Sequence, residues 1–244
     1  MAEVLHLLAA GSLAKALANP EPVAGRPVIT RFGASGLLRE AIEMGAPWDI
    51  FVSANTDHPA RLHRAGLGTP PRAFCRNRLC LILRPEVAGH DAAALLGRHD
   101  LRIGISTPGN DPSGDYAIEV LRRLDRIAPG ANAVERARPL TGAPDLPVVP
   151  EGRNTYAWHL VEGAADLFLT YRSNGIAART DTPELRVLDL PEPLAVQASY
   201  ALITRKGAPP EVEALADRLL AMPLQGRLRV LGFDPVPQLH RSPA

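Results

Sequence analysis

Hydrophobic and polar residues alternate along this chain in blocks whose spacing changes between strand-like and helix-like. Short continuous apolar runs are typical of buried strands, whereas apolar residues three and four positions apart are typical of helices. An apolar run that begins at Leu5 predicts a first strand. Further strands are predicted over 28–32, 49–54, 79–83, 101–106, 166–171, 187–190 and 199–203, and helices over 113–127, 155–161, 211–220 and 224–231. This alternation indicates an α/β fold with largely parallel sheets.

Small residues and a polar residue recur where several helices are expected to begin. Ser12 follows the first strand, Ser35 follows Gly33 and Ala34, and Ser113 and Asn154 stand at two later helix starts. Ser and Asn are common N-caps, so we expect Ser12 and Ser35 to cap helices. A helix start has unpaired amides and about half a positive charge, which favours an anion. One such start is usually an ordinary cap, but four in succession suggest an anion site.

Composition narrows the classes of function. The chain has 244 residues, 46% hydrophobic and 22% charged, enough for one large core or two smaller ones. A net charge of +1, with the basic residues scattered, gives no reason to expect nucleic acid or an anionic membrane as a partner. No apolar run approaches the roughly 20 residues that cross a bilayer, and the start has no signal-peptide pattern. We therefore expect a cytoplasmic protein or a mature periplasmic one.

The motifs of common enzymes and metal sites are missing. The segment 33–37 departs from G-x-S-x-G because Leu37 replaces the second glycine, and neither a P-loop nor a strand-linked G-x-G-x-x-G is present. His58 and His63 are five positions apart and would not share a helix face. Cys75 and Cys80, at an odd separation in a strand, would point to opposite faces and are expected to be buried free thiols. We expect no enzyme and no directly coordinated metal.

Several of these segments resemble the molybdate-binding proteins that serve ABC importers, within the type II periplasmic-binding-protein fold. The most specific is the run 42–54, which is similar to the family pattern E-x-G-A-P-x-D-[LIV]-F-[LIV]-S-A. Other similar segments are 9–13, 32–36, 112–117, 161–166 with Tyr171, and Gly232 with Phe233; Phe74, Asn77 and Leu79 match the segment that enters the second domain. The resemblance covers nearly the whole chain.

The resemblance implies a two-lobe α/β fold with a ligand cleft between the lobes. We expect residues 1–80 and 197–244 to form one lobe and residues 81–196 the other. The implied oxyanion donors are the hydroxyls of Ser12, Ser35 and Tyr171 and the backbone amides of Ser113 and Asn154. The implied ligand is molybdate or tungstate, held as a tetrahedral oxyanion with no cofactor. The implied partner is an ABC transporter permease subunit, and the protein is expected to be a periplasmic monomer.

Some positions depart from the family pattern. Pro20 shortens the first helix, and Asp111 with Pro112 resembles an archaeal tungstate-binding branch that uses carboxylates as ligands. That branch has an acidic residue where this chain has Thr170, so we expect Asp111 to be a cap or turn residue. Arg31, Arg153 and Arg172 flank the expected site and are expected to be solvated.

Two alternatives stay open for the ligand and the role. Phosphate keeps a proton near neutral pH and needs an acceptor for it, so a site made only of donors would reject phosphate. Such a site would accept sulfate, so the size of the pocket must separate sulfate from molybdate. A cytoplasmic oxyanion sensor of the same fold, or a sulfate-type anion-binding protein, would give a similar sequence.

Overall fold

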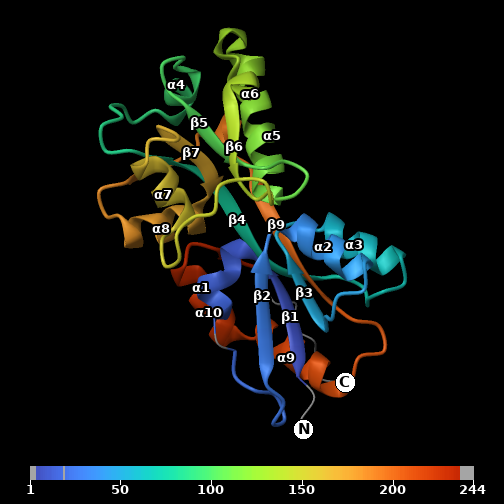
Figure 1. Cartoon of the computed structure of the whole chain (residues 1–244). Coiled ribbons are helices and arrows are strands. Elements are labelled where there is room, and N and C mark those ends of the chain that lie inside the picture. Colours follow the sequence, from blue (N-terminus) through green and yellow to red (C-terminus); the bar gives the residue numbers. More distant parts are fainter. Residues whose placement is uncertain (1–3, 19, 237–244) are drawn as a thin grey trace.

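The computed structural model describes residues 4–18 and 20–236 and shows two lobes joined by two long strands (Figure 1). The first lobe contains β1 (Leu5–Ala10), β2 (Val28–Gly33), β3 (Ile50–Ser53) and β10 (Asp234–Pro235), with the short 3-10 turn Gly11–Leu13 and the helices α1 (Ala14–Leu17), α2 (Ser35–Glu43), α3 (Asp57–Arg64), α9 (Pro210–Leu220) and α10 (Met222–Val230). The second contains β5 (Ile103–Ser106), β6 (Ala137–Thr141), β7 (Leu167–Tyr171) and β8 (Arg186–Asp189), with the helices α4 (Ala92–Gly97), α5 (Pro112–Ile127), α6 (Ala133–Arg136), α7 (Thr155–Val161) and α8 (Arg172–Asp181) and the 3-10 turns Pro129–Ala131 and Glu192–Leu194.

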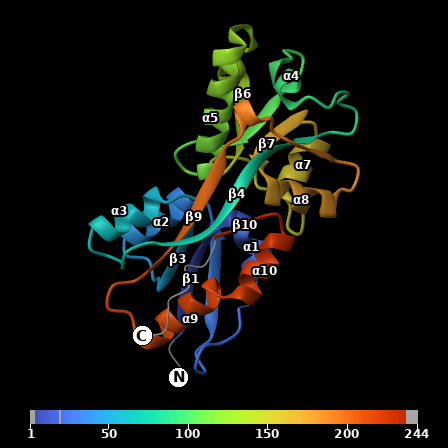
Figure 2. The ribbon, with the colours of Figure 1, turned by 180° about the vertical axis from the view of Figure 1, so that it is seen from behind.

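The strands β4 (Arg72–Leu83) and β9 (Gln197–Thr204) run side by side from one lobe to the other (Figure 2). The strand order is β2-β1-β3-β9-β4-β7-β5-β6, with β8 and β10 also paired to β4. β4 exchanges partners near its middle, because Arg78 pairs with Gln197 of β9 whereas Leu79 pairs with Tyr171 of β7. The predicted lobe limits at 80/81 and 196/197 stay a prediction, and their ends at 1–3 and 237–244 lie outside the described residues.

Both faces of the first lobe's sheet are covered, which explains the continuous apolar run of β1. In Figure 1, α2 and α3 lie to one side of β1–β3 and α1 and α10 to the other. Residues of α9 share one core cluster with Leu5 and Leu7 of β1. On the first side, Leu8 and Phe51 pack with Leu38 and Ile42 of α2. Strands buried on both faces lose the polar alternation of half-exposed strands. The helices therefore fix the carboxyl ends of β1 and β2 beside the second lobe.

Some expected elements differ in the structure. No strand was predicted over 136–150, a segment rich in proline that was expected to be mostly loop, but Ala137–Thr141 forms β6 there and pairs in parallel with β5. β6 is at the end of the strand order, and an edge strand tolerates Pro139 because the missing N–H breaks no inner ladder. The strand expected over 79–83 begins earlier, at Arg72. The helices α3, α4, α6 and α8 were not predicted, whereas α1 ends at Leu17, before Pro20, as expected.

Two further expectations concern thiols and membrane spans. Cys75 and Cys80 are free and buried, as predicted. Burial in apolar surroundings raises the pKa of Cys80 to about 12, so its thiol stays protonated near neutral pH. Within residues 4–18 and 20–236, every helix is too short or too polar to cross a membrane.

Candidate functional site

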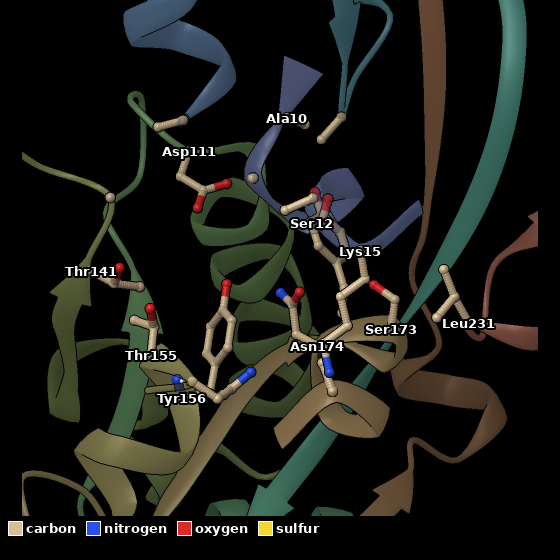
Figure 3. A pocket seen from close by; sticks show the side chains of 18 of the residues that line it. Ala10, Ser12, Lys15, Asp111, Thr141, Thr155, Tyr156, Ser173, Asn174 and Leu231 are labelled. Carbon is tan, nitrogen blue, oxygen red and sulfur yellow. Dashed lines mark hydrogen bonds between the residues drawn. The ribbon is translucent and has the colours of Figure 1, made fainter. Parts of the chain in front are cut away.

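A cavity of about 390 Å³ lies where the two lobes meet (Figure 3). The first lobe lines it with the segment after β1, the end of β2 and the start of α2, and the second lobe with Asp111, the end of β6, the start of α7 and residues of α8. Of the predicted donors, Ser12, Ser35, Asn154 and Tyr171 line this cavity together. The structure therefore brings four of the five candidate residues to one place.

Ser12 reaches the cavity from a 3-10 turn and does not cap a helix as expected. The cap position belongs to Ala10, which makes no side-chain cap bond, and Ser12 lies inside the turn. A residue with helical backbone angles cannot cap, because a cap needs the extended conformation that precedes the helix. The Ser12 hydroxyl instead lies 2.9 Å from the hydroxyl of Tyr200 on β9.

Ser35 is the first residue of α2, so the expected cap is again one residue off. Ala34 occupies the cap position without a side-chain bond. The Ser35 hydroxyl oxygen accepts a hydrogen bond of 3.1 Å from the amide of Ala54. An oxygen that accepts this bond keeps its own hydrogen to donate, so Ser35 can offer that hydrogen to an anion in the cavity.

Ser113 lies behind the cavity wall, and its neighbour Asp111 lines the cavity in its place. Asp111 is the N-cap of α5, as expected for a cap residue, and its Oδ1 accepts from the Ser113 amide at 3.0 Å. The Ser113 hydroxyl lies 3.1 Å from the Thr170 hydroxyl, and both residues are fully buried. The Ser113 amide, which was predicted to bind the ligand, therefore binds the carboxylate of Asp111, and this carboxylate lines the cavity.

Asn154 caps α7 as the pattern predicted. Its Oδ1 accepts hydrogen bonds of 3.1 Å from the amides of both Tyr156 and Ala157. Tyr156 comes two residues after the cap, and Figure 3 shows its hydroxyl end extending into the same space as the carboxylate of Asp111. Tyr156 was not predicted as a site residue, although its position two residues after Asn154, at a predicted helix start, could have indicated it.

Tyr171 supplies the clearest candidate donor. Only 1% of the residue is exposed, and its hydroxyl has no hydrogen-bond partner among the described residues. Burial raises the pKa of Tyr171 well above its ordinary value, with smaller contributions from Tyr200 and Asp111. The hydroxyl therefore stays protonated, so that its free hydrogen can be donated to a ligand.

A buried chain of side chains lies behind Ser12 and connects the two lobes. The hydroxyl of Tyr200, which contacts Ser12, accepts a hydrogen bond of 3.5 Å from the Nδ2 of Asn77. The same Nδ2 donates to the Ser173 hydroxyl at 2.7 Å. Asn77 lies on β4 just before that strand changes partner, and Ser173 lies on α8. This chain fixes Ser12 relative to the second lobe, and its members could be found only once the strands were placed.

Two cations border the cavity. Lys15, on α1, lines it and was not singled out from the sequence; Arg153 lines it just before α7 and lies 3.9 Å from Asp181. The other flanking arginines point elsewhere, because Arg172 pairs with Asp189 at 3.0 Å and Arg31 is exposed. No group of three or more His, Cys, Asp or Glu that could hold a metal ion is found among the described residues.

The two lobes also touch beside the cavity through their backbones. The amide of Gly36, in the first turn of α2, donates a 2.9 Å hydrogen bond to the carbonyl of Asn110 in the other lobe. A Cβ at Gly36 would lie 2.7 Å from that oxygen and 2.8 Å from the carbonyl oxygen of Gly109. Only glycine allows this approach, so Gly36 is a contact point between the lobes.

The profile of the bacterial extracellular solute-binding proteins matches residues 5–234 of the chain. The chain belongs to this family. It is 37% identical to the uncharacterised protein PM1146 of Pasteurella multocida (strain Pm70) over 210 residues, which cover 84% of this chain and 86% of that protein. It is 30% identical to the molybdate-binding protein ModA of Rhodobacter capsulatus over 102 residues, or 41% of this chain and 40% of that one.

Solved structures show the fold of this solute-binding protein. The periplasmic molybdate-binding protein of Azotobacter vinelandii superposes with a TM-score of 0.73 at 20% identity, covering 96% of this chain and 100% of that one. The sulfate-binding protein SubI of Mycobacterium tuberculosis H37Rv superposes with a TM-score of 0.76 at 16% identity, covering 96% and 87%. The predicted type II periplasmic-binding-protein fold is thereby confirmed.

The cavity differs from the expected site in one chemical respect. The expectation that phosphate is rejected assumed a site made only of donors, but Asp111 places a carboxylate among the lining residues. A carboxylate accepts hydrogen bonds, so it could take the proton of hydrogen phosphate. A cavity with this carboxylate therefore does not exclude phosphate.

Proposed function

We propose that this solute-binding protein binds molybdate or tungstate, as a tetrahedral oxyanion, in the cavity between its lobes. The proposed donors are the hydroxyls of Ser12, Ser35 and Tyr171 and the backbone amide of Asn154 at the start of α7. Under this proposal the protein acts in the periplasm as a monomer, delivers the anion to the permease of an ABC importer and catalyses no reaction.

The unpartnered hydroxyl of Tyr171 carries the proposal. A buried hydroxyl without a partner costs about 1–3 kcal/mol, which an anion oxygen in the cavity would recover. Ser35 faces the same cavity from the opposite lobe with a hydrogen still to donate. Donors from both lobes would hold one small anion with many oxygens better than either lobe could alone, because a buried dianion needs several converging hydrogen bonds.

The cations at the cavity support an anionic ligand of any kind. Lys15 and Arg153 would offset part of a double negative charge and speed its approach, since opposite charges steer association. The choice among oxyanions is a matter of size. A water molecule takes about 30 Å³ of liquid, so an anion with four oxygens would fill only part of the cavity, and further closure of the lobes or water would fill the rest.

Calorimetry on ligand-free protein with molybdate, tungstate and sulfate tests the proposal. We expect tight binding of molybdate and tungstate and weaker binding of sulfate, because the smaller anion cannot reach donors on both lobes at once. Sulfate binding tighter than molybdate binding would instead favour a sulfate-type protein. Heat of binding from none of the three anions would refute the oxyanion site.

A further inference from the structure

The carboxyl group of Asp111 stands in the cavity that the proposed anion occupies. Asp111 lines the cavity, and Figure 3 shows its carboxylate extending toward the space between Tyr156 and the Ser12 side. Among the described residues, no cation forms a salt bridge with Asp111, so the negative charge of its carboxylate is not neutralised. A dianion and this carboxylate would repel each other at close range.

The groups around Asp111 do not remove that conflict. The Ser113 amide binds Oδ1 and, with Ser106 of β5, favours the ionised carboxyl group, but desolvation outweighs both and Asp115 adds a second negative charge nearby. From α7, β7 and β9, the facing titratable groups are the hydroxyls of Tyr156, Tyr171 and Tyr200, which all experience the negative charge of Asp111. These tyrosines stay neutral, because burial raises the pKa of each.

The two cations that line the cavity do not balance the ligand together with Asp111. Lys15 and Arg153 bring two positive charges, and Arg153 already lies 3.9 Å from Asp181, whereas a dianion and an ionised Asp111 bring three negative ones. One proton would reduce this excess of negative charge. Desolvation raises the pKa of Asp111 even before an anion enters, and the negative charge of a dianion would raise it further.

We propose that Asp111 is a specificity-determining residue that holds one proton between its carboxyl group and an oxygen of the bound anion. A fully ionised anion such as molybdate or sulfate takes this proton from solvent on binding and returns it on release. Hydrogen phosphate brings the proton with it, so its binding needs no uptake. The inference rests on the proposed function, since it concerns the same cavity and the same class of ligand.

Proton uptake can be measured directly. Calorimetry with sodium molybdate in three buffers of different ionisation enthalpy gives the number of protons taken up, and we expect it to approach one above the pKa of Asp111. Over the same range the affinity for molybdate should fall about tenfold per pH unit. Uptake of no proton by the wild-type protein, with an affinity that does not change with pH, would overturn the proposal.

Asp111→Asn is the matched variant, because asparagine caps helices as well as aspartate does and leaves the start of α5 intact. We expect this variant to bind molybdate without proton uptake and to lose the pH dependence. Asp91→Asn is the control, since Asp91 caps α4 in the same manner, accepting from Ala93 and Ala94, away from the cavity. It should keep both the uptake and the slope.

The remaining outcomes separate this inference from the proposed function. A complete loss of molybdate binding in Asp111→Asn, with wild-type melting temperature, would mean that the carboxylate itself holds the metal centre, and would refute the shared proton. If molybdate does not bind the wild-type protein, sulfate is the probe. Sulfate binding with uptake of one proton would support the role of Asp111 while the molybdate assignment fails.

Discussion

Gly36→Ala tests whether the backbone contact between the lobes contributes to ligand binding. The new Cβ would meet two carbonyl oxygens of the other lobe at 2.7 and 2.8 Å, distances that real Cβ atoms essentially never show. Both oxygens belong to backbone, so no flexible side chain can move away. The lobes would have to separate locally, and the bond from the Gly36 amide to Asn110, 2.9 Å long, would be lost or lengthened.

The expected size of this effect follows from the lost bond. A net hydrogen bond of about 0.5–1.5 kcal/mol corresponds to a 2- to 13-fold weaker affinity for molybdate, and the steric clash adds to it. The helix α2 should not suffer, because alanine favours a helix over glycine by about 1 kcal/mol. Calorimetry measures the affinity, small-angle scattering the closure of the lobes, and thermal melting the fold.

Gly226→Ala is the matched control, since Gly226 lies within α10 and, apart from the adjacent backbone of its own helix, no atom of the described residues lies within 4 Å of a Cβ built there. It makes the same chemical change inside a helix without touching the other lobe. We expect its affinity and its closure to equal those of the wild-type protein. If Gly36→Ala binds molybdate as tightly as Gly226→Ala and closes to the same extent, the contact plays no part in binding.

Two further predictions concern the donors and one ion pair at the surface. Calorimetry should show molybdate binding weakened by about 10- to 150-fold in each of Ser12→Ala, Ser35→Ala and Tyr171→Phe, because a hydrogen bond to a charged group contributes about 1.5–3 kcal/mol. Wild-type affinity in both serine variants would mean that the anion binds elsewhere. Arg102 donates to Asp166 at 2.9 and 2.7 Å and holds its pKa at about 2, below the usual 3.8. This carboxylate therefore stabilises the fold above about pH 4 and loses its effect toward pH 2. Asp166→Asn should lower the free energy of unfolding by about 1–2 kcal/mol at neutral pH in urea titrations, and the difference from wild type should shrink in acid. A difference that stays constant with pH would contradict the ion-pair explanation.

The sequence predicted the strands well where burial alone determines them. β1, β3 and β7 lie under helices on both faces, so their apolar runs are continuous and easy to recognise. β6 was missed because the surrounding segment 136–150 has four prolines and one glycine, a composition typical of loops. Only the place of β6 at the edge of the sheet makes Pro139 acceptable. The amphipathic helix α5 and the cap Asn154 were predicted because both are local features.

The candidate site was predicted by position but not by bonding. Ser12 and Ser35 face the cavity, yet neither caps a helix, because each lies one or two residues inside the turn that it was expected to start. Whether a serine caps depends on one backbone dihedral angle, which the pattern of residue types does not determine. Tyr200 and Gly36 escaped notice for another reason, since their contacts join segments far apart in the chain.

The two lobes contribute different chemistry to the proposed site, and this difference bears on how ligand choice is set. The first lobe offers the hydroxyls of Ser12 and Ser35, which any tetrahedral oxyanion can accept from, whatever its protonation state. The second offers an acceptor, Asp111, and a donor, Tyr171, so that under the shared-proton proposal it responds to whether the anion or the solvent supplies a proton. Discrimination by size needs both lobes, since it depends on how far they close. Discrimination by protonation needs only position 111, so exchanging that one side chain would alter the second kind of selectivity and leave the first unchanged.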